Sequence, residues 1–174
     1  MNIEDFIKKS PKAELHLHIE GTLEPELMFS LAKRNNIKIP FKNIDDVKKA
    51  YNFNNLDSFL KIYYEGAKVL IKEQDFFDLT WAYILKCKED NIVHTEIFFD
   101  PQTHTDRGVD FDKVINGIFR ALKKAEKEFG LSFKIIMCFL RHLSEDESFK
   151  ILDKALAHKD KIYGVGLDSS EKGN

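Results

Sequence analysis

The stretch Ala-Glu-Leu-His-Leu-His-Ile, residues 13–19, alternates strictly between apolar and polar side chains. A period of two is typical of a β-strand, and Gly21 indicates that the strand has ended by that point. Side chains two positions apart on a strand share a face, so Glu14, His16, His18 and Glu20 are expected on one side of the sheet. The sequence therefore predicts an opening strand with a polar inner face and an apolar outer face that packs on helices.

Helical and strand-like periods alternate after this strand. Thr22 is expected to cap a helix that runs from about residue 23 to residue 35, with Pro25 in its first turn. Asp110 and Gly130 are expected to begin and end the clearest helix of the chain. The other expected elements are a short helix over 44–51, helices over 55–71 and 74–90, a strand over 93–99 ended by the turn at 100–101, a strand over 133–140, a helix from 145 to about 158, and a strand over 162–167.

This order of elements predicts a parallel α/β sheet, because one strand and a long helical excursion precede a βαβαβ pattern. Two architectures remain open at this point. One is an open, doubly wound sheet, and the other is part of a (β/α)₈ barrel with four of its eight strands. A whole barrel typically needs about 250 residues. The 174 residues of this chain are therefore too few to close one.

Composition indicates one ordinary globular domain and excludes several classes of partner. Apolar residues make up 43% of the chain, charged residues 32%, and the net charge is −2. This near balance of acids and bases favours neither nucleic acid nor a membrane surface as partner. We expect a cytoplasmic protein, because Cys87 and Cys138 lie far apart, the start of the chain resembles no secretory signal, and no apolar run approaches the roughly 20 residues of a membrane span.

The pair His16 and His18 is the sharpest candidate for chemistry. Two imidazoles on one face near the carboxyl end of a strand can bind one divalent metal, and neutral imidazole nitrogens suit Zn²⁺ at roughly 2.0–2.1 Å. The alternative is two unrelated polar histidines near a strand end, because the motif is short. Glu14 on the same face and the position at the strand end favour the metal.

Four segments, in order along the chain, carry a resemblance to a known family. Residues 11–22, Pro-Lys-Ala-Glu-Leu-His-Leu-His-Ile-Glu-Gly-Thr, resemble the opening strand of the adenosine/adenine deaminases, which are metal-dependent amidohydrolase barrels. Residues 95–105, Thr-Glu-Ile-Phe-Phe-Asp-Pro-Gln-Thr-His-Thr, resemble the second-strand segment of the adenine deaminase branch. The pair at 141–142, Arg-His, resembles a family pair, and residues 166–171, Gly-Leu-Asp-Ser-Ser-Glu, resemble the fourth-strand segment of the same branch.

The resemblance implies a fold and a reaction. The fold is the N-terminal part, about four βα units, of a TIM (β/α)₈ barrel with extra helices between strands 1 and 2. Residues 1–174 would form a single partial deaminase domain, truncated after strand 4. The reaction is zinc-dependent hydrolytic deamination of adenine, a small purine base, to hypoxanthine and ammonia, with one Zn²⁺ per complete site. Deamination of adenosine to inosine is the alternative.

The resemblance also assigns residues. It implies that His16 and His18 are zinc ligands. The family's third histidine, its aspartate ligand and its proton-donating glutamate match no position up to residue 174, so none of the family's catalytic residues is present and we expect the chain alone to be inactive. At the position of Glu20 the adenosine deaminases carry an aspartate that meets the ribose. A glutamate there implies a substrate-binding residue that takes the space of a ribose and favours adenine.

Further candidates surround the expected site. Phe59 and Tyr63 lie on a helix that in the family shields the site, although a plain core-facing stripe explains them equally well. Residues just beyond strand ends are candidates to orient the metal ligands or shape the substrate pocket, with a structural hydrogen-bonding role as the alternative for each. They are Asp100, His104, Arg141, His142 and Asp168. His94 and His158 are expected to be surface or packing residues.

A non-catalytic alternative follows from the same half-barrel. Four strands leave two sheet edges exposed, and exposed edges invite pairing with another copy or aggregation. A half-barrel that acts only through binding or self-association therefore stands beside the enzyme, and a homodimer of half-barrels is one form of it. Such a dimer would repeat the first four strands and would still lack the family's later ligands.

Overall fold

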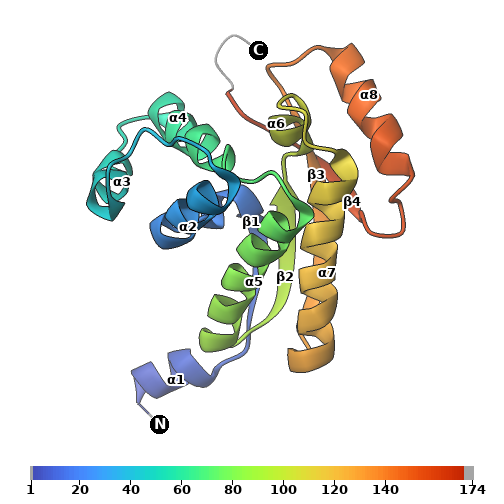
Figure 1. The fold of residues 1–174 in the computed structure, drawn as a ribbon. Coiled ribbons are helices and arrows are strands. Elements are labelled where there is room, and N and C mark those ends of the chain that lie inside the picture. Colours follow the sequence, from blue (N-terminus) through green and yellow to red (C-terminus); the bar gives the residue numbers. More distant parts are fainter. Residues whose placement is uncertain (1, 171–174) are drawn as a thin grey trace.

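The computed structural model describes residues 2–170 and contains one four-stranded parallel sheet with strand order β1-β2-β3-β4 (Figure 1). Right-handed crossovers between strands added in chain order place the helices that directly precede the second, third and fourth strands on one face, as in a barrel wall. The elements are α1 (Ile3–Lys9), β1 (Lys12–His18), the 3-10 helix η1 (Ile19–Thr22), α2 (Pro25–Asn35), α3 (Ile44–Ala50), α4 (Leu56–Ala67), α5 (Glu73–Glu89), β2 (Ile92–Phe99), α6 (Pro101–Thr105), α7 (Phe111–Phe129), β3 (Ser132–Leu140), α8 (Glu145–Leu156) and β4 (Gly164–Asp168).

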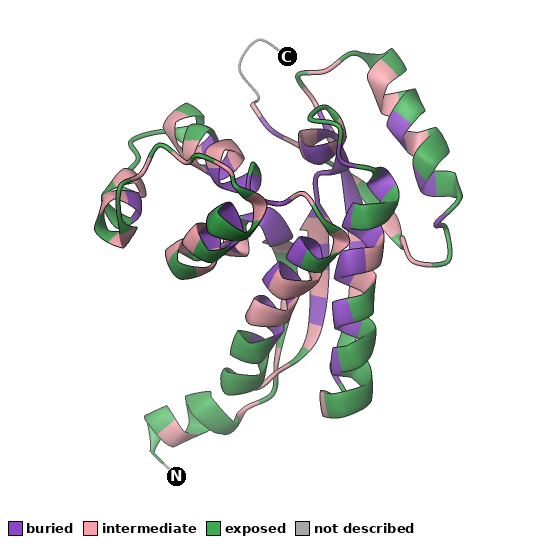
Figure 2. Cartoon of the chain, viewed as in Figure 1, coloured by how far each residue is buried: buried purple, intermediate pink, exposed green. Residues whose placement is uncertain are grey.

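The hydrophobic core lies on one face of this sheet, between the strands and helices α5, α7 and α8, and it extends to the buried residues of α2 and α3 (Figure 2). Ile97 of β2 and Ile135 of β3 point into it and are fully buried, together with Phe76 of α5 and Ile118 of α7. Figure 1 shows α5 and α7 side by side along the same face of the strands. A doubly wound sheet carries helices on both faces, so the structure is a half-barrel and the open alternative is excluded.

Helices α5 and α7 approach one another at a glycine. A Cβ atom on Gly117 would lie 2.4 Å from the backbone oxygen of Glu73 and 2.7 Å from the Cβ of Phe76. Real Cβ atoms do not approach other heavy atoms so closely, so only glycine permits this distance between the two helix backbones. The contact brings α7 close to the start of α5, and Phe76 is completely buried there.

Strand β1 corrects one expectation about its faces. Glu14 pairs with Thr95 of β2, but Leu17 pairs with Ile97, so three steps on β1 match two on β2 and the strand carries a β-bulge. The bulge turns Glu14 to the helix side, where its Oε2 accepts a 2.7 Å hydrogen bond from the Tyr83 hydroxyl. Glu14 therefore does not share the face of the two histidines, and Glu20 lies beyond the strand, in η1. Strict alternation was the wrong premise, because a bulge shifts the pleat by one residue.

The start of α2 also differs from the expectation. Thr22 does not cap the helix; its hydroxyl donates to the backbone oxygen of Ile19 at 2.7 Å and closes η1. Glu24 occupies the N-cap position, and Pro25 is the first helical residue. Proline costs nothing there because the first helical N–H groups have no intrahelical acceptor.

Two short helices were not expected from the sequence. Helix α1 precedes the first strand, and α6 begins at Pro101 directly after β2, where only a turn was predicted. The expected helix over 145–158 ends at Leu156, and the last strand begins two residues later than expected, at Gly164. The end of the 166–171 motif, residue 171, lies outside the described residues. Within residues 2–170, the helices are all too short or too polar to cross a membrane.

Candidate metal and substrate site

His16 and His18 lie on the inner face of β1, opposite the core. Their ring centroids are 5.5 Å apart, and both rings pack on Phe98 of β2, at 4.5 and 5.3 Å respectively. His16 is exposed and His18 is half-buried. The predicted pairing of two imidazoles on one face at the carboxyl end of β1 is thus present in the structure.

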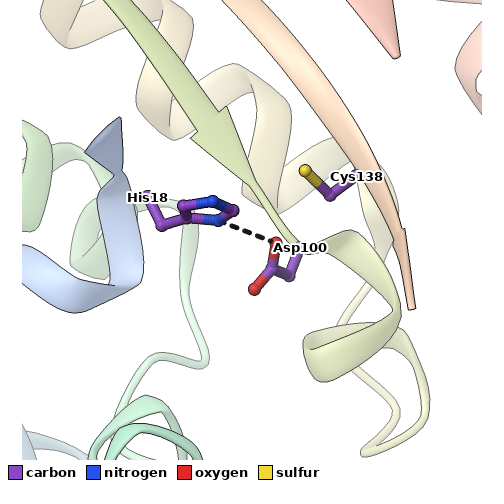
Figure 3. Close-up of side chains that lie close together, drawn as sticks. All are labelled: His18, Asp100 and Cys138. Atoms are coloured by element: carbon purple, nitrogen blue, oxygen red, sulfur yellow. Dashed lines mark ion pairs between the residues drawn. The ribbon is translucent and has the colours of Figure 1, made fainter. Parts of the chain in front are cut away.

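Two carboxylates from other strand ends face His18. Asp100 directly follows β2, and Asp168 is the last residue of β4. The Nδ1 atom of His18 lies 3.2 Å from Oδ2 of Asp168 and 3.5 Å from Oδ1 of Asp100; the second pair is drawn in Figure 3. Burial lowers the pKa of His18, but these two carboxylates outweigh it and raise the pKa to about 10.

This arrangement leaves one nitrogen of His18 for a ligand. Histidines that bind metals usually direct their second ring nitrogen at a carboxylate or carbonyl, which sets the tautomer and the ring orientation. Nδ1 of His18 is buried and lies between Asp100 and Asp168, so Nε2 is the atom that can bind a metal. The residues present therefore fit a divalent ion held by imidazoles and supported by carboxylates.

A second set of ligand atoms lies beside the first. Atoms of His18, Asp100 and Cys138 of β3 come within 4.8 Å of one another, the only such cluster within residues 2–170 (Figure 3). Burial raises the pKa of the Cys138 thiol, and the nearby carboxylates of Asp100, Asp168 and Glu20 raise it further. A metal ligand must be deprotonated, so a metal here would displace a proton from the Cys138 thiol as well as from the His18 imidazole. Nothing in the sequence pattern had singled out Cys138.

Glu20 lies in η1, two residues after His18, and is buried at 3% exposure. Its Oε1 accepts a 3.0 Å hydrogen bond from the backbone N–H of Asp100 and lies 3.0 Å from Nε2 of His104. Its Oε2 accepts from the Tyr63 hydroxyl at 3.2 Å. Burial alone would raise the pKa of Glu20, but His104 and the backbone N–H lower it. Both oxygens of this predicted substrate-binding residue are therefore already engaged by protein groups.

Helix α4 covers one side of the site. Tyr63 is buried, and its hydroxyl donates a 2.7 Å hydrogen bond to Oδ2 of Asp100. Phe59 is half-buried, and the centroid of its ring lies 5.8 Å from that of Tyr63. Burial raises the pKa of Tyr63 well above its usual value, and the charges of Glu20 and Asp100 add to the effect. The helix predicted to shield the site does border it, and it carries polar groups as well as a core stripe.

The rim at the end of β4 is tied to α4 and to the segment after β3. The Tyr64 hydroxyl donates to Oγ of Ser169 at 2.8 Å, and Nδ1 of His142 lies 2.7 Å from the same oxygen. Ser169 has a φ of 83°, an uncommon backbone conformation for a residue other than glycine. Such conformations cluster at functional sites. The structure thus brings His142 to the site through Ser169, a residue that had no assigned role.

Arg141 binds the backbone of β4. Its backbone N–H donates to the backbone oxygen of Asp168 at 3.0 Å, and its guanidinium donates to the backbone oxygen of Leu167 at 3.4 Å. These contacts hold the strand end that presents the Asp168 carboxylate. His94 contacts Ser132 at the opposite end of the sheet, and His158 contacts Asp112, so both lie apart from the site as expected.

Comparison with curated proteins finds many close relatives. The chain is 68% identical over 170 residues to the adenine deaminase of Psychrobacter cryohalolentis, which aligns with 98% of this chain and 51% of the relative. It is 64% identical over 172 residues to the adenine deaminase of Wolinella succinogenes, with 99% of this chain and 52% of the relative covered. The chain therefore spans about half the length of the curated relatives it matches.

Solved structures agree in fold. The crystal structure of adenine deaminase from Arthrobacter aurescens superposes with a TM-score of 0.90 at 49% identity, covering 93% of this chain and 50% of that one. An amidohydrolase from Burkholderia ambifaria, solved with bound zinc, superposes with a TM-score of 0.84 at 23% identity, covering 99% and 48%, and supports the fold alone. The sequence pattern of the family described as adenosine deaminase matches residues 11–174, so the chain belongs to the adenosine deaminase family.

Proposed function

We propose that this chain forms the first half, one partial barrel domain, of a zinc-dependent adenine deaminase. The observation that carries the proposal is His18, whose Nδ1 lies between Asp100 and Asp168 while its ring shares a face with His16. Relatives at 58–68% identity are named adenine deaminase, which favours adenine over adenosine as the substrate. On this proposal the substrate is a free purine base.

His16 and His18 would hold the zinc ion. A zinc ion bound at such a site supplies Lewis acidity that activates water for attack on the purine ring. The chain's own residues support it: Asp168 and Asp100 orient the His18 ring, and Phe98 fixes the separation of the two imidazoles. Tyr63 and Phe59 border the site on the side of α4.

Glu20 would select the substrate. Its carboxylate is fully engaged, so its influence on substrate choice would come from the space its side chain fills and from the position it gives Tyr63. A shorter aspartate would not span the same partners. We keep the prediction that glutamate at this position favours adenine over its riboside, with His142, Arg141 and Asp168 shaping the rim.

The experiment that tests this function uses the chain joined to the C-terminal half of the Psychrobacter cryohalolentis relative, and measures ammonia release from adenine and from adenosine. We expect turnover of adenine and loss of turnover in the His18→Ala form. Lys159→Ala, a change at an exposed residue in the turn that follows α8, is the matched control. Turnover of adenosine alone, or full activity after His18→Ala, would contradict the proposal. The 174-residue chain by itself is expected to release no ammonia.

A second proposed property is association through the sheet edges. Val165 and Leu167 of β4 are 57% and 62% exposed, and Leu15 on β1 is 57% exposed. These apolar side chains lie on the two outer strands of the half-barrel, where no described element covers them. Their exposure supports contact with a second protein surface, either another copy or a complementary half.

The cytoplasm is the proposed location, since Cys87 and Cys138 are both buried free thiols.

A further inference from the structure

Arg107 lies just after α6 and reaches back to the end of α4. Its Nε donates to the backbone oxygen of Thr103 at 2.9 Å. Its two terminal nitrogens donate to backbone oxygens at and just beyond the end of α4, those of Ala67, Lys68 and Leu70, at 3.0, 3.2 and 3.3 Å. It also makes a 2.9 Å contact from Nη2 to Nδ1 of His104. Arg107 was not among the residues that the sequence pattern suggested.

The contact with Arg107 determines the tautomer of His104. A guanidinium has only donors, so Nδ1 of His104 must be the acceptor and the proton of the neutral ring must lie on Nε2. That N–H then points at Oε1 of Glu20, 3.0 Å away. The His104 ring is completely buried and meets Phe76 edge-on, with centroids 4.8 Å apart, so the ring is packed on a neighbouring side chain as well as hydrogen-bonded.

Glu20 connects His104 to the site by further hydrogen bonds. The oxygen that accepts from His104 also accepts from the backbone N–H of Asp100, and the other oxygen accepts from the hydroxyl of Tyr63. Asp100 in turn lies beside His18 and accepts a hydrogen bond from the Tyr63 hydroxyl of α4. One chain of hydrogen bonds therefore links the Arg107 guanidinium to the groups that surround the candidate metal ligand.

We propose that Arg107 is a positioning residue, which holds His104 as its Nε2–H tautomer and thereby fixes Glu20, Tyr63 and the end of β2 at Asp100. The hydrogen bonds themselves lie entirely within the described residues and do not depend on the proposed function. Only the role of these bonds in supporting a zinc site rests on that function. A simpler role is that Arg107 merely ties α6 to the carbonyl end of α4. In that case the tautomer of His104 would not depend on the guanidinium.

The test is nuclear magnetic resonance of the purified 174-residue chain, labelled with ¹⁵N in histidine and ¹³C in the tyrosine rings. Long-range ¹H–¹⁵N correlations report which ring nitrogen of His104 carries the proton. Arg107→Met removes every guanidinium donor, and Arg120→Met, an exposed arginine on α7 that pairs with Glu73, is the matched control. His104→Gln is a second variant, because its amide N–H can still donate to Glu20.

We expect an exchange-protected Nε2–H on His104 in the unmodified chain and in Arg120→Met. In Arg107→Met we expect loss of that protection, a mixture of tautomers and shifted Tyr63 ring signals, whereas His104→Gln should keep the Tyr63 signals. A proton on Nδ1 in the unmodified chain would overturn the proposal without any substitution. An unchanged tautomer in Arg107→Met would do the same. Neither readout depends on zinc or adenine, so failure here and failure of the proposed function are separate results.

Discussion

Nδ1 of His18 lies 3.2 Å from Oδ2 of Asp168, although the two residues belong to β1 and β4, the two outer strands of the sheet. The inner face of the half-barrel is concave, so the carboxyl ends of its first and last strands converge. This contact links the candidate metal ligand to the end of the described chain. It also makes Asp168 the residue whose substitution tests the site most directly.

Asp168→Asn should weaken zinc binding by the chain about tenfold. Outer carboxylates that orient a metal-binding histidine typically contribute 10- to 100-fold to affinity, and Asp100 would still face the same nitrogen. Zinc affinity can be measured by competition with a chromophoric chelator. Asp153→Asn, on the exposed face of α8, should leave the affinity unchanged. Equal affinities for all three proteins would show that Asp168 does not support a zinc ligand.

Gly117→Ala should destabilise the fold, although alanine normally stabilises a helix by about 1 kcal/mol relative to glycine. The new methyl group would lie 2.4 Å from the backbone oxygen of Glu73, so α5 and α7 must separate. Overpacking of this kind typically costs about 1–3 kcal/mol. Urea unfolding gives the free energy directly. Lys127→Ala on the exposed side of α7 is the control, and a stability gain in Gly117→Ala would rule out the tight contact.

Asp75 should make folding stability depend on pH in the acidic range. Burial would raise its pKa, but the backbone N–H groups of Lys72 and Ile71, with Arg34 and Asn35, lower the pKa below its usual value. A group whose folded pKa is depressed stabilises the fold above its unfolded pKa and loses that contribution as pH falls through the folded pKa. Its contribution should therefore be full at pH 7 and should decline below the unfolded value near 3.8.

The measurement compares urea unfolding of the unmodified chain and of Asp75→Asn from pH 7 down to pH 3. At pH 7 the substitution should cost about 2 kcal/mol, as expected for hydrogen bonds to a buried charged group. The cost should shrink at the acidic end. Asp78→Asn, on the same helix and also paired with Arg34 but half-exposed, should cost less at every pH. A cost for Asp75→Asn that does not change with pH would contradict the assigned pKa direction.

Leu167→Lys should reduce self-association of the chain. Leu167 is 62% exposed on the outer face of β4, and a charge there disfavours burial against another apolar surface. Gel filtration with light scattering over a range of concentrations measures the change in mass. Ile3→Lys on α1, which is 70% exposed and away from β4, is the control. A monomer at all concentrations in the unmodified chain would remove the basis for the proposed association.

Much of the fold was predictable because its signals are local. The apolar period of α7 and its glycine end predicted that helix at the bounds observed, Phe111–Phe129. The continuous apolar run of β3 predicted a strand that differs by one residue at its start. The bulge in β1 was not predictable, because it depends on how residues 14–17 pair with β2 and leaves no mark in the alternation. Helix α6 was missed because its five residues are too few to show a helical period.

The sequence by itself determined the order of strands and helices and the pair of histidines at positions 16 and 18. These depend on side-chain periods of two and about four residues, which neighbouring positions express directly. Only the tertiary structure decided which groups surround that pair. Glu20 and His104 are 84 residues apart in the chain, and their side chains lie 3.0 Å apart in space. They meet because parallel strands bring their carboxyl ends to the same end of the sheet. The number of residues between two positions does not predict which strand ends meet in space.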